Sequence, residues 1–150
     1  MKKQVGIVGA LLATGALVIA FHGHGDAQAA GQPPFTTGTA DGQAFGGAGI
    51  TLQPTTASPV LSESEALTDA WEHNPWGDKQ ASALAILGMA TPNPGLGMLA
   101  KPTLVWAIVY DNACIPVLGP GGGPPQCGAK GAVFVNATSG EILGSEAPVG

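Results

Sequence analysis

The sequence predicts an α+β fold, in which one helix packs on a small antiparallel sheet of three to four strands. A capped, amphipathic stretch at 62–74 indicates the helix. An unbroken run of β-branched and aromatic residues at 103–110 indicates a central strand. An alternating apolar run at 132–135, followed by a turn and a second short apolar segment, indicates a hairpin. We expect residues 61–147 to form the folded domain.

Residues 1–29 have the pattern of a signal peptide. Lys2 and Lys3 precede an uncharged apolar run at 5–21, and Ala-Gln-Ala at 27–29 offers small residues for cleavage. The alternative is an uncleaved anchor, which would contact the membrane only through residues 5–21; that run is short beside the about 20 residues of a spanning helix. We therefore expect a secreted or cell-envelope protein.

Residues 30–60 are rich in glycine, proline and threonine, and they show no sustained helical or strand period. Such a composition buries little apolar surface to offset the entropy lost on ordering. It predicts a flexible linker between the leader and the domain.

The helix is expected to begin after Ser62. Ser62 and Glu65 have the spacing of a capping box, in which each side chain bonds the other residue's amide. Leu67, Ala70 and Trp71 then share one face, and Asn74-Pro75 ends the helix. This apolar face requires a packing partner.

The sheet is expected to supply that partner. A strand is predicted near 84–91, and the run at 103–110 places Trp106 on one face and Val105 on the other. Trp71 and Trp106 are predicted to pack between helix and sheet. A ligand groove at that interface is the alternative, and Trp76 is expected to be a packing residue as well.

Cys114 and Cys127 are predicted to form a structural disulfide. In an exported chain a single cysteine pair is typically oxidised, the spacing differs from the C-x-x-C redox motif, and no histidine lies nearby to complete a zinc site. The bond would close the insertion after the central strand, a constraint that contributes about 3 kcal/mol in the loop-entropy estimate.

The last hairpin turns at Asn-Ala-Thr-Ser-Gly, residues 136–140. The Asn136 side chain is suited to bond the backbone two residues further on, and Gly140 is suited to a positive φ. Ile142 and Leu143 then resume as a short strand.

This set of motifs resembles the PepSY and PepSY-like family. The resemblance lies in the S-x-x-E-A-L helix start, the strand segment at 106–109, and the hairpin at 133–143, Val-Phe-Val-Asn-Ala-Thr-Ser-Gly-Glu-Ile-Leu. Asn136 stands where the family usually has aspartate and Ser139 where it has threonine, and both replacements keep the turn chemistry. The match spans roughly residues 61–145.

The resemblance implies an exported bacterial protein with a binding or regulatory function. Such domains occur in propeptides of secreted metalloproteases and are suspected of restraining peptidases, and the family offers no catalytic residues to carry over. The resemblance therefore implies a protein that is not an enzyme and needs no cofactor.

Two histidine-containing segments are candidate sites. His22, His24 and Asp26 are suitable metal ligands, but they precede the expected cleavage point. His73 lies at the end of the predicted helix, where an interaction with the helix dipole explains it without a catalytic partner.

Charge restricts the partners. Without the leader the chain keeps three lysines against nine acidic residues and no arginine, a formal charge of −6, which excludes nucleic-acid binding. The principal hypothesis is a protein-binding module with a secreted or cell-envelope partner. The alternatives are a protease inhibitor or propeptide-like chaperone acting in trans, and a small hydrolase or metal-binding protein.

Overall fold

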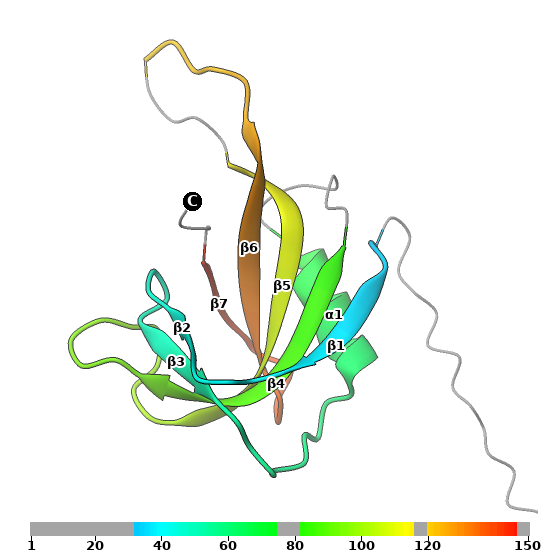
Figure 1. Ribbon diagram of the computed structural model, residues 1–150, viewed down its shortest axis with the longest axis vertical. Coiled ribbons are helices and arrows are strands. Elements are labelled where there is room, and N and C mark those ends of the chain that lie inside the picture. Colours follow the sequence, from blue (N-terminus) through cyan, green and yellow to red (C-terminus); the bar gives the residue numbers. More distant parts are fainter. Residues whose placement is uncertain (1–31, 75–81, 116–119, 147–150) are drawn as a thin grey trace, which may run out of the picture.

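A computed structural model describes residues 32–74, 82–115 and 120–146. It contains one helix, α1 (Glu63–Glu72), among seven strands. The strands are β1 (Phe35–Thr39), β2 (Gln43–Phe45), β3 (Ile50–Gln53), β4 (Ala83–Pro92), β5 (Thr103–Ile115), β6 (Gln126–Asn136) and β7 (Ile142–Glu146). Figure 1 shows the strands as one strongly twisted sheet with α1 against it.

The sheet has the order β2-β3-β4-β5-β6-β7, and these neighbours are antiparallel. β1 runs parallel to the first half of β4, and β3 pairs with the second half of the same strand. The two pairings meet at Gly88. A Cβ atom on Gly88 would lie 2.5 Å from Cγ of Leu52 and 2.9 Å from Cβ of Ala40, so the close approach requires glycine.

The α+β prediction is wrong, because the described chain is mostly β and its sheet has seven strands instead of three to four. The expectation of a flexible linker at 30–60 is wrong for the same reason, since this segment supplies β1, β2 and β3. Ile50 and Leu52 are fully buried despite the glycine-rich surroundings. The segment is ordered because its few apolar side chains cover a sheet face that would otherwise be exposed to water.

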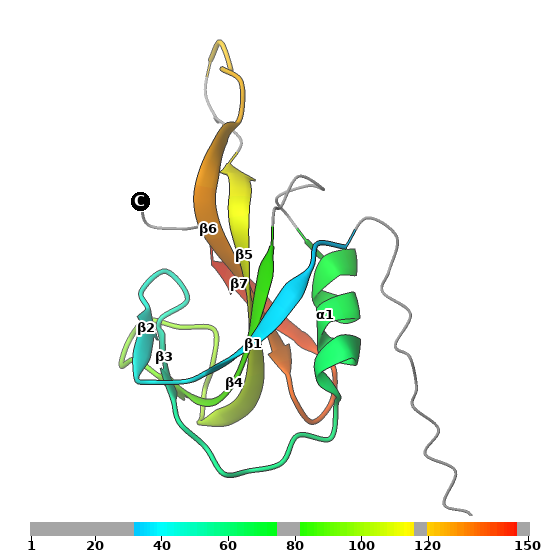
Figure 2. The same ribbon diagram turned by 45° about the vertical axis from the view of Figure 1, so that its right-hand side comes forward.

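The core has one cluster on each face of the sheet. On one face, α1 packs against a cluster that includes Trp106, Ile108 and Tyr110. On the other face, residues of the β1–β3 segment pack against Val105, Ala107 and Phe134. Figure 2 shows α1 on one side of the central strands and β2 and β3 on the other. The alternation along β5 matches the two predicted faces, and both of them are buried.

The predicted strands and helix lie close to their expected positions. β4 spans the strand expected at 84–91, and β5 and β6 include the expected runs at 103–110 and 132–135. Both β5 and β6 continue into the insertion between them, where the sequence predicted a loop closed only by its disulfide. This additional pairing between β5 and β6 forms the part of the structure that contains the candidate site.

Candidate functional site

β5 and β6 extend beyond the rest of the sheet as two paired strands, residues 111–115 and 126–130; with the connecting residues 120–125 we call this segment the ribbon (Figure 1). Residues 120–128 are all exposed. Among the ribbon residues whose side chains the structure describes, Ala113 alone belongs to a core cluster. Most described side chains of this part of the ribbon are therefore exposed to solvent.

Two irregularities separate the ribbon from the sheet. The regular β5–β6 register ends at Tyr110 and Gly131, and shifts follow on both sides of the pair Ala113–Ala129. Asn112 has a φ of 61°, the left-handed conformation that asparagine tolerates better than most residues. Such bulges interrupt the ladder and increase its twist. The ribbon therefore starts at a break in the ladder.

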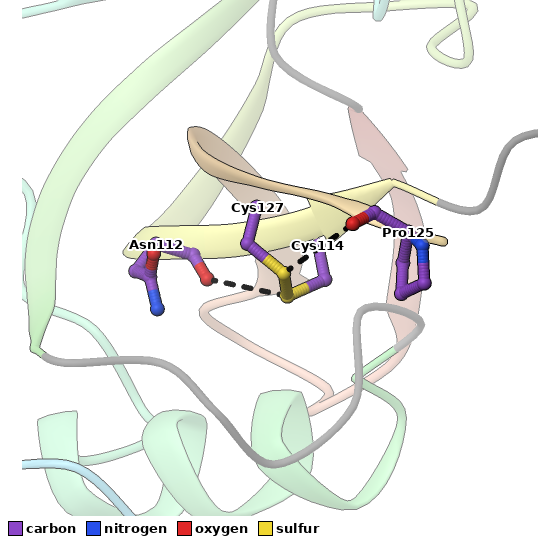
Figure 3. The surroundings of a disulfide bond; sticks show 4 residues. All are labelled: Asn112, Cys114, Pro125 and Cys127. Atoms are coloured by element: carbon purple, nitrogen blue, oxygen red, sulfur yellow. Dashed lines mark hydrogen bonds between the residues drawn. A yellow bond between two sulfur atoms is a disulfide. The ribbon is translucent and has the colours of Figure 1, made fainter. Parts of the chain in front are cut away.

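The predicted disulfide is confirmed. Cys114 and Cys127 are opposite each other on β5 and β6, with their Cα atoms 4.0 Å apart. Each sulfur lies 4.0 Å from a main-chain carbonyl oxygen, Cys114 from Asn112 and Cys127 from Pro125 (Figure 3). An oxidised sulfur has no hydrogen to donate, so these are contacts only. The bond cross-links the ribbon outside both core clusters.

A small polar cluster lies at the base of the ribbon. The Asp111 carboxylate accepts a hydrogen bond from the Ser82 hydroxyl at 2.7 Å, and the Ser82 carbonyl accepts one from the Asp111 amide at 3.0 Å. Nζ of Lys130 lies 3.8 Å from the same carboxylate. The Lys130 and Asp111 side chains are 75% and 51% exposed, so this ion pair adds little stability. The Ser82 bonds attach the ribbon base to β4.

A groove of about 240 Å³ lies beside the ribbon base, between β2 and the strands β5 to β7. It is lined by Gln43, Ala44, Phe45, Val109, Lys130, Gly131, Ala132 and Glu146. Glu146 is buried, and its carboxylate accepts hydrogen bonds from the amides of Gly47 and Ala48. This carboxylate is therefore engaged in holding the β2–β3 turn.

The predicted capping box is present at the start of α1. The Ser62 hydroxyl accepts a hydrogen bond from the Glu65 amide at 3.3 Å, and the Glu65 carboxylate accepts one from the Ser62 amide at 2.8 Å. The Ser62 hydroxyl also donates a hydrogen bond to the Glu65 carboxylate at 2.7 Å, and this bond, followed by that from the Ser62 amide, lowers the pKa of Glu65. The box positions the helix and lies outside the ribbon.

The two tryptophans expected at the helix–sheet interface belong to one cluster, which Trp106 joins as a buried member and Trp71 as a partly buried one. Nε1 of Trp106 donates to the Leu61 carbonyl at 3.0 Å. The Trp71 ring is 6.1 Å from that of Tyr110, whose burial raises its pKa. These contacts are those of packing residues. Trp76 lies outside the described residues.

Asn136 and Gly140 form the expected turn. Oδ1 of Asn136 accepts hydrogen bonds from the amides of Thr138 and Ser139, at 2.9 and 3.2 Å, and Gly140 has a φ of 76°. Their function is to connect β6 to β7.

The histidine candidates have different outcomes. His73 is exposed, and its Nδ1 lies 2.9 Å from the Asp69 carbonyl within the end of α1. His22, His24 and Asp26 lie outside the described residues, as does the expected leader at 1–29. Within the described ranges, three or more histidine, cysteine or acidic side chains do not gather as a metal site. Within the same ranges, α1 is too short and too polar to cross a membrane.

The ribbon and the Glu146 contact were not predicted from the sequence. Asp-Asn at 111–112, directly after a strong strand, was an available signal that the strand becomes irregular there. Glu146 bonds residues almost a hundred positions earlier, and no local pattern indicates such a pairing.

Comparisons with protein-family models, with curated proteins and with solved structures found no match to this chain. The resemblance to the PepSY family stays a prediction.

Proposed function

We propose that this protein is an exported, non-catalytic binding module that contacts a secreted or cell-envelope protein through the ribbon. The observation that carries the proposal is a paired two-stranded ribbon in which residues 126–128 of β6 are exposed and a disulfide joins the two strands. A two-stranded ribbon by itself is marginally stable in water. The disulfide stabilises exposed residues that belong to neither core cluster. Such a cross-link is best explained by a function of these residues in binding a partner protein.

Preorganisation is the physical benefit of this arrangement. A flexible loop loses conformational entropy when it binds, and that loss weakens the complex. The Cys114–Cys127 bond restricts the ribbon before any partner arrives. Among the described strands, residues 113–115 and 126–129 pair only with each other, so an extended partner segment could pair with the backbone groups on their outer edges.

Export is supported by two features. Disulfides persist in oxidising compartments, and the chain contains one. The apolar run and small residues at 1–29 have the pattern of a leader. Together they support a location outside the cytoplasm, where the partner would be found.

Site-specific cross-linking tests the proposal. A photo-reactive amino acid replaces Gln126, an exposed ribbon residue, and in a matched control it replaces Glu72, which is exposed on α1. Each protein is irradiated in culture medium and envelope fractions of the native host. We expect one reproducible adduct from position 126 only, and we expect excess unlabelled protein to suppress it.

Equal adducts from positions 126 and 72 would show non-specific capture and would count against the ribbon. Repeated failure to obtain any adduct from several ribbon positions would reject the proposal.

Inhibition of a secreted peptidase in trans is a second candidate, favoured by the same ribbon. An exposed, cross-linked strand is suited to occupy an extended substrate cleft without being flexible enough to be cut readily. Titration of the purified protein into a panel of secreted metalloproteases should then show stoichiometric loss of activity. Unchanged activity across the panel would leave the binding module as the remaining proposal.

A further inference from the structure

We propose that the Cys114–Cys127 disulfide is a reducible latch: a dithiol reductant opens it and releases the ribbon, while the sheet stays folded. The latch itself is a property of this chain. Its consequence, control over partner contact, rests on the proposed function of the ribbon.

The disulfide is accessible from solvent. Cys127 is exposed and Cys114 is partly buried, and neither belongs to a core cluster. The neighbouring positions 125, 126 and 128 are also exposed, so an attacking thiolate can approach the Cys127 sulfur. Reduction of a buried disulfide would first require the core to open. The Cys114–Cys127 bond can be reduced without that step.

The dithiol opens the Cys114–Cys127 bond by thiol–disulfide exchange. A thiolate of the dithiol attacks Sγ of Cys127, the bond between the two sulfurs breaks, and Cys114 leaves as a thiolate. The second thiol of the reductant, after losing its proton, attacks the mixed disulfide and frees Cys127. Two electrons and two protons pass from the dithiol, which becomes a disulfide, to the two cysteines.

The reduced thiols have acceptors in place. The carbonyl oxygens of Asn112 and Pro125 lie 4.0 Å from the two sulfurs, within range of weak S–H···O bonds (Figure 3). The oxidised sulfurs cannot use these acceptors because they carry no hydrogen.

The effect of reduction is expected to stop at the base of the ribbon. The irregular register between Tyr110 and Ala113 separates the ribbon ladder from the main ladder. Beyond Ala113 the described ribbon side chains belong to neither core cluster. At the break, Asp111 remains attached to Ser82, and below it the two faces of β5 remain packed. The part of the ribbon beyond Ala113 can thus open without removing a described core contact.

Hydrogen exchange on the full chain, with and without dithiothreitol, tests the latch. We expect the amide of Gln126, which pairs with Ile115 next to the disulfide, to exchange about a hundredfold faster after reduction, the factor that corresponds to losing the loop-closure constraint. The amides of Ile108 and Val133, in the buried sheet, should keep their protection. Loss of protection at Ile108 and Val133 would overturn the proposal, and so would an unchanged ribbon.

A Cys114→Ser, Cys127→Ser double variant provides the matched control. It should show fast ribbon exchange at once, and dithiothreitol should not change it. Slow ribbon exchange in this variant would contradict the latch.

Cross-linking from Gln126, repeated on oxidised and reduced protein, separates the two proposals. An adduct that forms only from the oxidised protein supports regulation by the latch. An adduct that is equal in both states overturns regulation while leaving the binding function standing. Ribbon release without any adduct confirms the latch and rejects the binding function.

Discussion

The carboxylate of Glu146 accepts a hydrogen bond from the amide of Gly47 at 2.9 Å, although the two residues are 99 positions apart. Its second oxygen accepts from the Ala48 amide at 3.3 Å. A Cβ atom on Gly47 would lie 3.2 Å from Cγ of Glu146, so a side chain there would crowd the contact. These bonds attach the β2–β3 turn to the last residue of β7.

Glu146→Ala should destabilise the fold by about 1–3 kcal/mol, because it leaves two amides near the core without their acceptor. Chemical denaturation measures the change as a lower midpoint at constant slope. Glu141→Ala, at an exposed position before β7, is the control and should change stability by less than about 0.5 kcal/mol. Equal midpoints for the two variants would show that the Glu146 contact adds no stability.

Gly88→Ala should cost about 1–3 kcal/mol, because the new methyl group would overlap Leu52 and Ala40 where β1 and β3 meet along β4. Gly46→Ala is the matched control, since a Cβ there meets no atom within 4 Å. Thermal unfolding of both variants measures the difference. A Gly88→Ala protein as stable as Gly46→Ala would contradict the close packing of the β1–β3 segment.

Ser62→Ala should cost about 1 kcal/mol, because the Glu65 amide and carboxylate both lose a partner. Ser64→Ala, two residues further along in the first turn of α1, should be neutral or slightly stabilising, since alanine has the higher helix propensity. Urea midpoints measured side by side compare them. Identical midpoints would mean that packing alone holds the helix start.

Asp69→Asn should raise stability near neutral pH. Burial, followed by the nearby Glu72 and Glu65, raises the pKa of Asp69, while His73 opposes the shift. The folded state therefore holds the proton more tightly than the unfolded state, and the charged form costs stability above the raised pKa. The gain should be at most about 0.5 kcal/mol, since Asp69 is partly exposed and screened.

This gain should vanish as the pH falls to about 3, below the ordinary aspartate pKa of the unfolded chain, because Asp69 is then protonated in both states. Urea denaturation at both pH values provides the measurement. Asp41→Asn, on the exposed turn between β1 and β2, is the control. A gain that persists in acid would show that the effect is not due to the charge of Asp69.

The elements that could be predicted are those whose determining residues lie close together in the sequence. The capping box at Ser62 and Glu65, and the Asn136–Gly140 turn, depend on side chains that bond backbone within a few residues. Such bonds can be predicted because the partners are always near each other in the chain. The two faces of β5 could be predicted for the same reason, since alternation is a property of the strand itself.

The prediction of a flexible linker at 30–60 is wrong because composition reports average burial and not which few side chains are buried. Ile50 and Leu52 alternate over only four residues of β3, a pattern too short to outweigh the surrounding glycine and threonine. Val105 and Ala107 on β5 nevertheless need a cover, and these residues supply it. The apolar residues on the second face of β5 indicate that another segment must pack on that face. They do not indicate which segment it is.

The sequence alone determined the helix start, the strand cores, the last turn and the two cysteines that join, since each depends on neighbours along the chain or, for the cysteines, on there being only one possible pair. Tertiary structure decided that β1 and β3 share one edge of β4, that Glu146 holds Gly47, and that the insertion projects as a ribbon. These features depend on which distant segment can best cover an apolar face or satisfy a buried polar group. That competition is settled only when the whole chain packs together.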